Sequence, residues 1–213
     1  KKTYKFEQKT KWHHLDVLEH ILTVLDSTKP NLVLRMAALF HDMEKPKCFT
    51  KDDKGIGHFY NHFAVSAETA RTILKEMRYS EEFINRVYRL VYYHDRQIAL
   101  NKRSVLRFLH DFGDKDLDLY FDLKRADIQG QNPGLLYRLA EVDQLEQYTK
   151  EILLEQNTFS VKHLNIKGNQ LQTLGFQKED IQNTLEELLY LVMDGKIENT
   201  TMALIEYAKK LKR

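Results

Sequence analysis

The amino-acid sequence predicts an all-α protein, and three observations lead to that fold class. Only 8 of the 213 residues are Gly and 3 are Pro, whereas 42% are hydrophobic and 30% are charged. Apolar side chains recur at steps of three and four residues along almost the whole chain, which is the period of an amphipathic helix. The chain shows no internal repeat and no block of strand-like alternation. This composition excludes collagen-like and low-complexity chains and is typical of a globular protein that buries a core.

The first two helices are marked by their boundaries. Leucines at helical spacing predict a first helix over residues 13–28, which ends before Pro30. Asn31 can cap a second helix over residues 32–43, which is apolar nearly all round and is therefore expected to be buried. Pro46 is expected to end this second helix.

A loop and four further helices are expected next. Residues 47–60 are rich in Asp and Gly and predict the loop. Helices follow over residues 62–77 and 81–94, and Ser80 with two acidic residues after it is a typical start for the second of these. Two shorter helices complete this part of the chain, at residues 102–112 and 115–129.

The clearest break in the helical pattern is the segment 131–134, Gln-Asn-Pro-Gly. A long amphipathic helix is expected over residues 135–155, and an irregular connector over residues 157–168. Three helices close the chain, at about residues 169–174, 178–193 and 200–212. We therefore expect two domains, residues 1–156 and residues 157–213.

Charge and composition narrow the classes of function. The formal net charge of +2 is too small for a dedicated nucleic-acid-binding protein. No run of about 18 apolar residues is present, so no membrane partner is expected. The single cysteine, Cys48, has no intrachain partner for a disulfide, which favours a cytoplasmic location. Because the chain begins at Lys1 without an initiating Met, we expect it to be part of a longer protein.

The histidines indicate where the chemistry lies, because eight of the nine precede residue 111. His-Asp pairs occur at residues 41–42, 94–95 and 110–111. Only His41-Asp42 closes a nearly all-apolar helix, where both groups are costly to bury unless something satisfies them. Metal ligation satisfies both, since imidazole nitrogen and carboxylate oxygen are usual ligands of hydrolytic metal sites. His110-Asp111 is expected to be unrelated, because no apolar helix and no later ligand accompanies it.

Other candidate ligands lie near helix ends on both sides of this pair. His20 lies one helix earlier, and Asp16, four residues before it on the same helix face, could orient its imidazole. The full ordered set is His20, His41, Asp42, His62, His94 and Asp127.

This order resembles the HD superfamily of metal-dependent phosphohydrolases, whose signature is H…HD…D with optional additional histidines. The resemblance spans residues 13–130 and implies an HD-domain helical bundle followed by a small C-terminal helical extension. By that resemblance, the principal metal would be held by four residues, namely His20, His41, Asp42 and Asp127. His62 and His94 would hold a second metal, with Asp95 as the alternative to His94.

A closer resemblance comes from longer segments. Leu34–Asp42 and Gly57–His62 look like the HD region of bacterial tRNA nucleotidyltransferases, the CCA-adding and poly(A) polymerase relatives. Ile166–Asn169 and Asp194–Asn199 look like the C-terminal tail of that family. The polymerase head is absent from this sequence, which has no Gly-Gly pair, and the Asp-Leu-Asp of residues 116–118 lies in a helical pattern. We therefore do not expect this chain to add nucleotides by itself.

One departure from the family concerns the second residue after Asp42, where Gly is usual and this chain has Glu44. Glycine permits a left-handed turn and the close approach of a phosphate. Glutamate is expected to put bulk and negative charge beside an anionic substrate, which Lys45 would offset.

The metal and the groups that bind phosphate can be narrowed by donor chemistry. Ligation by His and Asp without Cys suits Mn, Fe, Ni or Co better than a structural Zn, although the spacing does not choose among these ions, Mg and Zn. We expect one or two divalent ions. Three cationic side chains are expected to bind the phosphoryl group: Lys45, Arg96 and Arg125.

Three functions stay open from the sequence. The first is a metal-dependent phosphatase or phosphodiesterase that acts on a nucleotide or RNA-end phosphoester. The alternative is the C-terminal, tRNA-binding HD portion of a tRNA nucleotidyltransferase-like protein, without catalysis of its own. A third is a regulatory HD module that binds metal and nucleotide without turnover. The sequence does not determine the oligomeric state.

Overall fold

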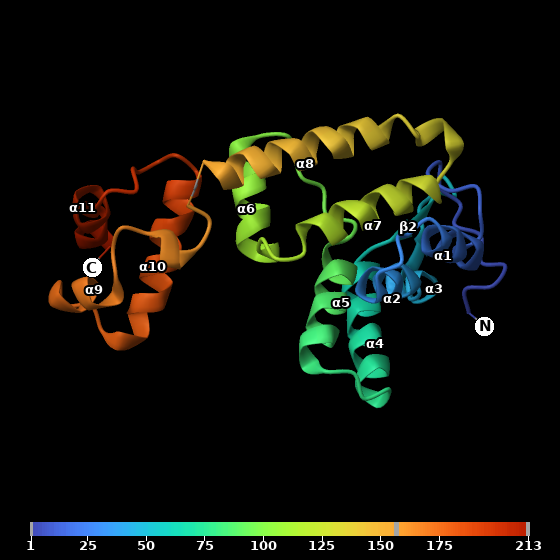
Figure 1. Cartoon of the computed structure of the whole chain (residues 1–213), viewed down its shortest axis with the longest axis horizontal. Coiled ribbons are helices and arrows are strands. Elements are labelled where there is room, and N and C mark those ends of the chain that lie inside the picture. Colours follow the sequence, from blue (N-terminus) through green and yellow to red (C-terminus); the bar gives the residue numbers. More distant parts are fainter. Residues whose placement is uncertain (1, 156–157, 212–213) are drawn as a thin grey trace. The chain divides into compact units, whose positions relative to one another are not determined.

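The described part of the chain is all-α apart from one short hairpin, and the sequence predicts the all-α class. A computed structural model describes residues 2–155 and 158–211 (Figure 1). No helix among those residues is both long enough and apolar enough to cross a lipid bilayer.

The described residues form two compact units. The first contains the described chain up to Gln97 together with Asp114–Glu146, and the second contains Ile98–Gly113 together with the described chain from Gln147 onward. The domain boundary expected between residues 156 and 157 falls outside the described residues, so it stays a prediction.

The first unit is a helical bundle with the hairpin on one side. Its elements in chain order are α1 (Val17–Asp26), α2 (Leu32–Phe40), α3 (Lys45–Cys48), β1 (Phe49–Lys51), β2 (Gly57–Phe59), α4 (His62–Glu76), α5 (Glu81–Tyr93), α7 (Leu117–Gln129), the 3-10 turn η1 (Pro133–Leu135) and the beginning of α8 (Arg138–Leu154). Helix α2 contacts α1, α4, α5 and α7, and α4 lies along α5 (Figure 1). The inward residues of α2 include Leu34, Ala37 and Ala38, which are fully buried. The end of α2 is therefore held inside the bundle.

Local capping residues set the helix starts. Asn31 and Ser80 cap α2 and α5 as predicted, because their side chains accept hydrogen bonds from the backbone N–H groups three residues later. Helix α1 begins at Val17, four residues later than predicted. The reason is a capping box in which Asp16 accepts from the Glu19 backbone and the Glu19 side chain accepts from the Asp16 backbone.

Two expectations about the segment after α2 are wrong. Pro46 does not end α2, which stops at Phe40; it lies in the first turn of α3, where its missing N–H costs no hydrogen bond. Residues 47–60 are not a simple loop, because β1 and β2 pair antiparallel with Thr50 opposite His58. The turn is closed by Asp52, whose side chain accepts from two backbone N–H groups.

The second unit contains α6 (Lys102–Phe112), the end of α8, the 3-10 turn η2 (Val161–His163), α9 (Gly168–Thr173), α10 (Lys178–Met193) and α11 (Thr201–Leu211). Helix α6 contacts α10, and Asp194, just after α10, forms ion pairs with Arg103 and Arg107 of α6 at 2.8 and 3.0 Å. His110 of α6 lies 3.2 Å from the carbonyl oxygen of Phe159 and 3.5 Å from Glu186. His110 thus belongs to the packing of this unit, whereas Asp111 is exposed.

Candidate metal centre

Four of the predicted histidines share one orientation. In each, Nδ1 lies within hydrogen-bond distance of a backbone carbonyl oxygen: His20 with Gly130 at 2.9 Å, and His41, His62 and His94 with Ala38, Phe59 and Val91 at 2.7 Å. A carbonyl can only accept, so Nδ1 carries a proton and donates it. The outward atom is therefore Nε2 in all four rings, which is the atom that binds a metal when it is unprotonated.

The fold places three of these histidines at helix ends. His41 directly follows α2, His62 is the first residue of α4, and His94 directly follows α5. His41, His62 and His94 each bond to the carbonyl oxygen of the residue three positions earlier, so the local turn fixes the ring. His20 differs, because its partner Gly130 lies 110 positions away, at the end of α7. Asp16, which the sequence suggested as the partner of His20, instead caps α1.

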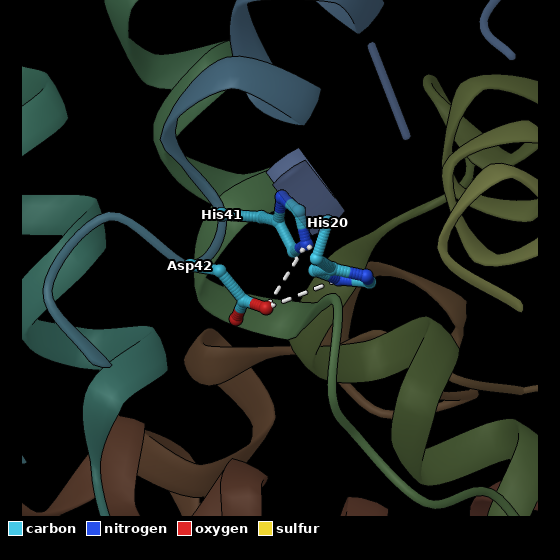
Figure 2. A group of neighbouring side chains, drawn as sticks. All are labelled: His20, His41 and Asp42. Atoms are coloured by element: carbon cyan, nitrogen blue, oxygen red, sulfur yellow. Dashed lines mark hydrogen bonds and ion pairs between the residues drawn. The ribbon is translucent and has the colours of Figure 1, made fainter. Parts of the chain in front are cut away.

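The first group of ligand atoms contains His20, His41, Asp42 and Asp127. Nε2 of His20 lies 3.2 Å from Nε2 of His41, 3.2 Å from Oδ2 of Asp42 and 3.1 Å from Oδ1 of Asp127. Nε2 of His41 lies 3.3 Å from the same oxygen of Asp42. Figure 2 shows both imidazoles and the Asp42 carboxylate directed at one another. The atoms of His20, His41 and Asp42 are close enough to share one ion, and Oδ1 of Asp127 lies beside the two imidazoles.

The second group contains Asp42, His62 and His94. Nε2 of His62 lies 3.3 Å from Nε2 of His94, and both face Oδ1 of Asp42, at 3.3 and 3.6 Å. All three residues are buried and close enough to share an ion. Asp42 therefore presents one oxygen to each group.

Asp42 is the strongest sign that a cation belongs here. Its side chain is 1% exposed, and neither carboxylate oxygen accepts a hydrogen bond among the described residues. The Lys45 ammonium forms an ion pair with Oδ2 at 2.6 Å. Lys45 therefore pairs Oδ2, whereas Oδ1 faces His62 and His94 without a hydrogen bond among the described residues, and a buried carboxylate oxygen is costly unless it is hydrogen-bonded, paired or bound to a metal. The donor set therefore fits one or two divalent ions.

The electrostatics of the first group follow from its two carboxylates. Burial lowers the pKa of His41, but the adjacent charge of Asp42 outweighs this and raises that pKa to about 10. Burial also lowers the pKa of His20, but Asp127 and Asp42 outweigh burial, so this pKa is raised above its usual value. Burial would raise the pKa of Asp42, yet His41 and Lys45 hold it well below its usual range. The carboxylates thus attract positive charge, which protons supply when no metal is bound.

A cavity of about 530 Å³ opens beside both groups. Its lining includes cationic side chains from α3, α7 and α8, namely Lys45, Lys124 and Arg138. Aromatic residues also line it, namely Trp12, Phe59, Tyr60 and Phe63. The volume lies within the range that binds small ligands.

Sequence reasoning missed several residues of this cavity: His13, Lys124, Gln131 and Arg138. His13 was expected only at the beginning of the first helix, yet its ring meets that of His20 edge to face at 4.7 Å. Helical spacing does not account for this contact, because α1 begins at Val17 and His13 lies in the segment before it. Gln131 and Arg138 gave no signal in the sequence, because both lie after α7 and outside the expected set of ligands.

The three predicted phosphate-binding cations lie in different surroundings. Lys45 is buried and also donates to Gln8 at 2.9 Å. Arg125 forms ion pairs with Asp143 and Glu146 of α8 and is not part of the cavity lining. Arg96 is not part of that lining either, although its neighbours Asp95 and Gln97 are.

Glu44 does not approach the cavity, contrary to the expectation that it puts charge beside the substrate. Its carboxylate accepts from the Thr69 hydroxyl at 3.1 Å and pairs with Lys47 at 3.0 Å. Its backbone, at φ −102° and ψ 8°, is not left-handed, so glycine is not required here. The Glu44 carboxylate is therefore engaged by Thr69 and Lys47 and is not part of the cavity lining.

Comparisons with known proteins agree with this geometry. The family model described as HD domain matches residues 12–128. An A-adding tRNA nucleotidyltransferase from Deinococcus radiodurans is 35% identical over 46% of this chain and 24% of its own length. A CC-adding tRNA nucleotidyltransferase from Thermus thermophilus is 34% identical over 60% of this chain and 27% of its own length. The matched region thus spans about a quarter of these relatives.

Proposed function

This chain belongs to the HD domain family, and from that premise we propose that it is a divalent-metal-dependent phosphohydrolase acting on a phosphoester of a nucleotide or of an RNA end. One observation carries the proposal. Asp42 is buried and directs one oxygen to each group of histidines, and although Lys45 pairs Oδ2, Oδ1 accepts no hydrogen bond among the described residues. A carboxylate shared by two ligand groups is suited to two ions close together, the arrangement that assists in-line displacement at phosphorus.

The candidate ligands would be divided between two ions. His20, His41, Asp42 and Asp127 would hold one ion, and Asp42 with His62 and His94 would hold the other. When bound, such ions lower the pKa of water and stabilise the charge that develops on phosphorus.

The cavity would bind the rest of the substrate. Lys45, Lys124 and Arg138 would neutralise the phosphoryl oxygens. Trp12 and Phe59 would offer aromatic faces on which a nucleobase can stack.

The ligand atoms of the site narrow the choice of metal ion but do not fix it. Imidazole nitrogen and carboxylate oxygen suit Mn, Fe, Ni, Co and Zn, and carboxylates also bind Mg. We propose one of these ions in each group and leave the choice to elemental analysis. A cytoplasmic location, which the unpaired Cys48 favours, stays a prediction.

The test is hydrolysis by metal-loaded protein. Phosphomonoesters, 2′,3′-cyclic nucleotides and dinucleotides are each incubated with protein reconstituted with Mn²⁺, Ni²⁺ or Co²⁺. We expect at least one class to be cleaved and expect His41→Ala and Asp42→Asn to lose at least about 100-fold in rate, since they remove metal ligands. His14→Ala and Asp53→Asn are matched controls, because both residues are exposed and outside the cavity lining. Metal-loaded protein that cleaves none of the three classes contradicts the proposal.

A second candidate function is support of tRNA binding within a longer tRNA nucleotidyltransferase-like protein, without hydrolysis. The names of the two relatives favour it, and so do the tail segments that resemble that family. It predicts salt-sensitive binding of tRNA, measured by fluorescence anisotropy from about 50 mM salt upward, with no cleavage of any phosphoester. An absence of tRNA binding at the lowest salt contradicts it for this chain.

A further inference from the structure

The segment that follows α7 supports two metal ligands at once. The carbonyl oxygen of Gly130 holds Nδ1 of His20 at 2.9 Å. The next residue, Gln131, donates from Nε2 to Oδ2 of Asp127 at 2.9 Å. Oδ1, the other oxygen of Asp127, is then the one that faces His20 and His41, at 3.1 and 3.7 Å.

The orientation of the Gln131 amide matters, because only one of its ends can serve Asp127. The NH₂ end donates to a carboxylate, whereas the carbonyl end would repel it. Arg138 decides between these two orientations, since its Nη1 donates to Oε1 of Gln131 at 2.8 Å. Arginine has no acceptor, so it can bind only the carbonyl end of the amide. Gln131 is a buried residue, 8% exposed, which leaves little water to compete.

Arg138 also reaches the substrate side of the site. It lines the cavity, and its guanidinium carbon lies 5.4 Å from the ring centre of Trp12. Among the described residues its guanidinium donates a single hydrogen bond, from Nη1 to Gln131. A guanidinium with several N–H donors can bind Gln131 and an anionic oxygen together.

We propose that Gln131 and Arg138 are positioning residues, arranged as a relay in which Arg138 orients the Gln131 amide and Gln131 orients the Asp127 carboxylate toward its metal. The inference rests on the proposed function in one respect only, which is that Asp127 binds a metal. Neither residue touches the metal in this scheme. Both set the affinity of the first group of ligands, and Arg138 connects that group to an anion in the cavity.

The experiment measures metal affinity and needs no substrate. Apo protein is titrated with Co²⁺ and followed by visible absorption, in the otherwise native chain and again in a His62→Ala background that removes a ligand of the second group. We expect Gln131→Met, which keeps the length and loses the amide, to weaken Co²⁺ binding by roughly 10- to 100-fold. Arg138→Met is expected to act in the same direction, and Arg138→Lys, which keeps one donor and the charge, to recover most of the loss.

The relay also predicts the Co²⁺ affinity of the double variant. Because Arg138 acts through Gln131, the double variant Gln131→Met/Arg138→Met should bind Co²⁺ about as weakly as Gln131→Met alone. Gln129→Met is the matched control, since Gln129 lies two positions away on α7, is exposed and is outside the cavity lining. Circular dichroism checks that every variant retains its helix content.

The outcomes separate the two ideas. Unchanged Co²⁺ affinity in Gln131→Met, unchanged affinity in Arg138→Met, or losses that add in the double variant would each overturn the relay. The expected pattern of affinities together with no cleavage of any phosphoester supports the relay and contradicts the proposed function. A native chain that binds no Co²⁺ overturns both.

Discussion

At the scale of single residues, the site depends on which atom of each side chain is already engaged. Four histidines direct Nδ1 at backbone carbonyls and are left with Nε2 for a ligand. Three of these bonds are local, so each helix end orients its own imidazole. The fourth, from His20 to Gly130, makes the site depend on the long-range packing of α1 against α7.

Gly130 is expected to tolerate no side chain. A Cβ built on it would lie 2.8 Å from Cγ2 of Val24 and 2.9 Å from Nδ1 of His20. Gly130→Ala should therefore lower the free energy of unfolding by about 1–3 kcal/mol, the usual cost of overpacking, and should weaken metal binding by displacing His20. Urea denaturation and Co²⁺ titration measure the two effects. Gly134→Ala is the control, because its Cβ would meet only Oδ1 of Asn132 at an ordinary 3.5 Å; equal behaviour of the two variants contradicts the account.

Metal affinity is expected to rise with pH. The raised pKa of His41, about 10, means that the metal-free site holds a proton at neutral pH, which a metal must displace. Below that pKa the free-ligand form becomes more common as pH rises, so binding should tighten between pH 6 and 8. Calorimetry in buffers of different ionisation enthalpy should also detect proton release. An affinity that is flat over this range, with no proton release, is incompatible with the electrostatics described for His41 and Asp42.

Glu44 provides a test of where its carboxylate points. Because it bonds to Thr69 and Lys47 and does not line the cavity, Glu44→Gly should leave Co²⁺ affinity and hydrolysis within about twofold of the native chain. The lost hydrogen bond should lower the free energy of unfolding by about 0.5–1.5 kcal/mol. A gain of tenfold or more in hydrolysis would show instead that Glu44 obstructs the substrate.

At the scale of secondary-structure elements, α2 is the support of the site, because its C-terminal end delivers His41 and Asp42. Leu34 on this helix is fully buried, and Leu34→Ala should lower the free energy of unfolding by about 2–5 kcal/mol through lost burial and a cavity. Leu32, on the same helix, is 54% exposed, so Leu32→Ala should change the free energy of unfolding by less than about 0.5 kcal/mol. Thermal denaturation of the two variants makes the comparison. Similar losses from both would mean that α2 is not the buried helix of the bundle.

The helices were predictable because their signals are local. Asn31 and Ser80 cap the helices that follow them, and the apolar run of α2 predicted its burial correctly. The short hairpin was missed because an Asp- and Gly-rich segment is typical of loops, and its pairing depends on contacts between β1 and β2. Pro46 was misassigned because proline is compatible with the first turn of a helix as well as with the end of one.

The candidate site was predictable only as a set of ligand types. The order of histidines and aspartates names the residues that the structure brings together. It does not contain the partner of His20, since Gly130 is 110 positions away, nor the support of Asp127 by Gln131. It also suggested that Asp16 orients the His20 imidazole, whereas the Asp16 side chain caps α1. Such contacts arise from tertiary packing, which a linear spacing does not record.

At the scale of the whole molecule, the candidate metal centre joins distant parts of the first unit. Its candidate ligands come from α1, the end of α2, the beginning of α4, the end of α5 and α7. A ligand that binds the folded state alone stabilises it by mass action, so a bound metal would stabilise the bundle as a whole. The second unit contributes none of the six candidate ligands among the described residues.

The most direct test of the central claim is metal content, compared among the native chain, Asp127→Asn and Asp42→Asn. Each protein is reconstituted with Mn²⁺ or Co²⁺, freed of excess ion and examined by elemental analysis. The native chain should retain an ion in each group, and the variants should differ because Asp42 faces both groups whereas Asp127 faces only the first. Asp127→Asn should lose the first ion, and Asp42→Asn should lose both. Native metal content in Asp42→Asn, with helix content unchanged, would contradict the account.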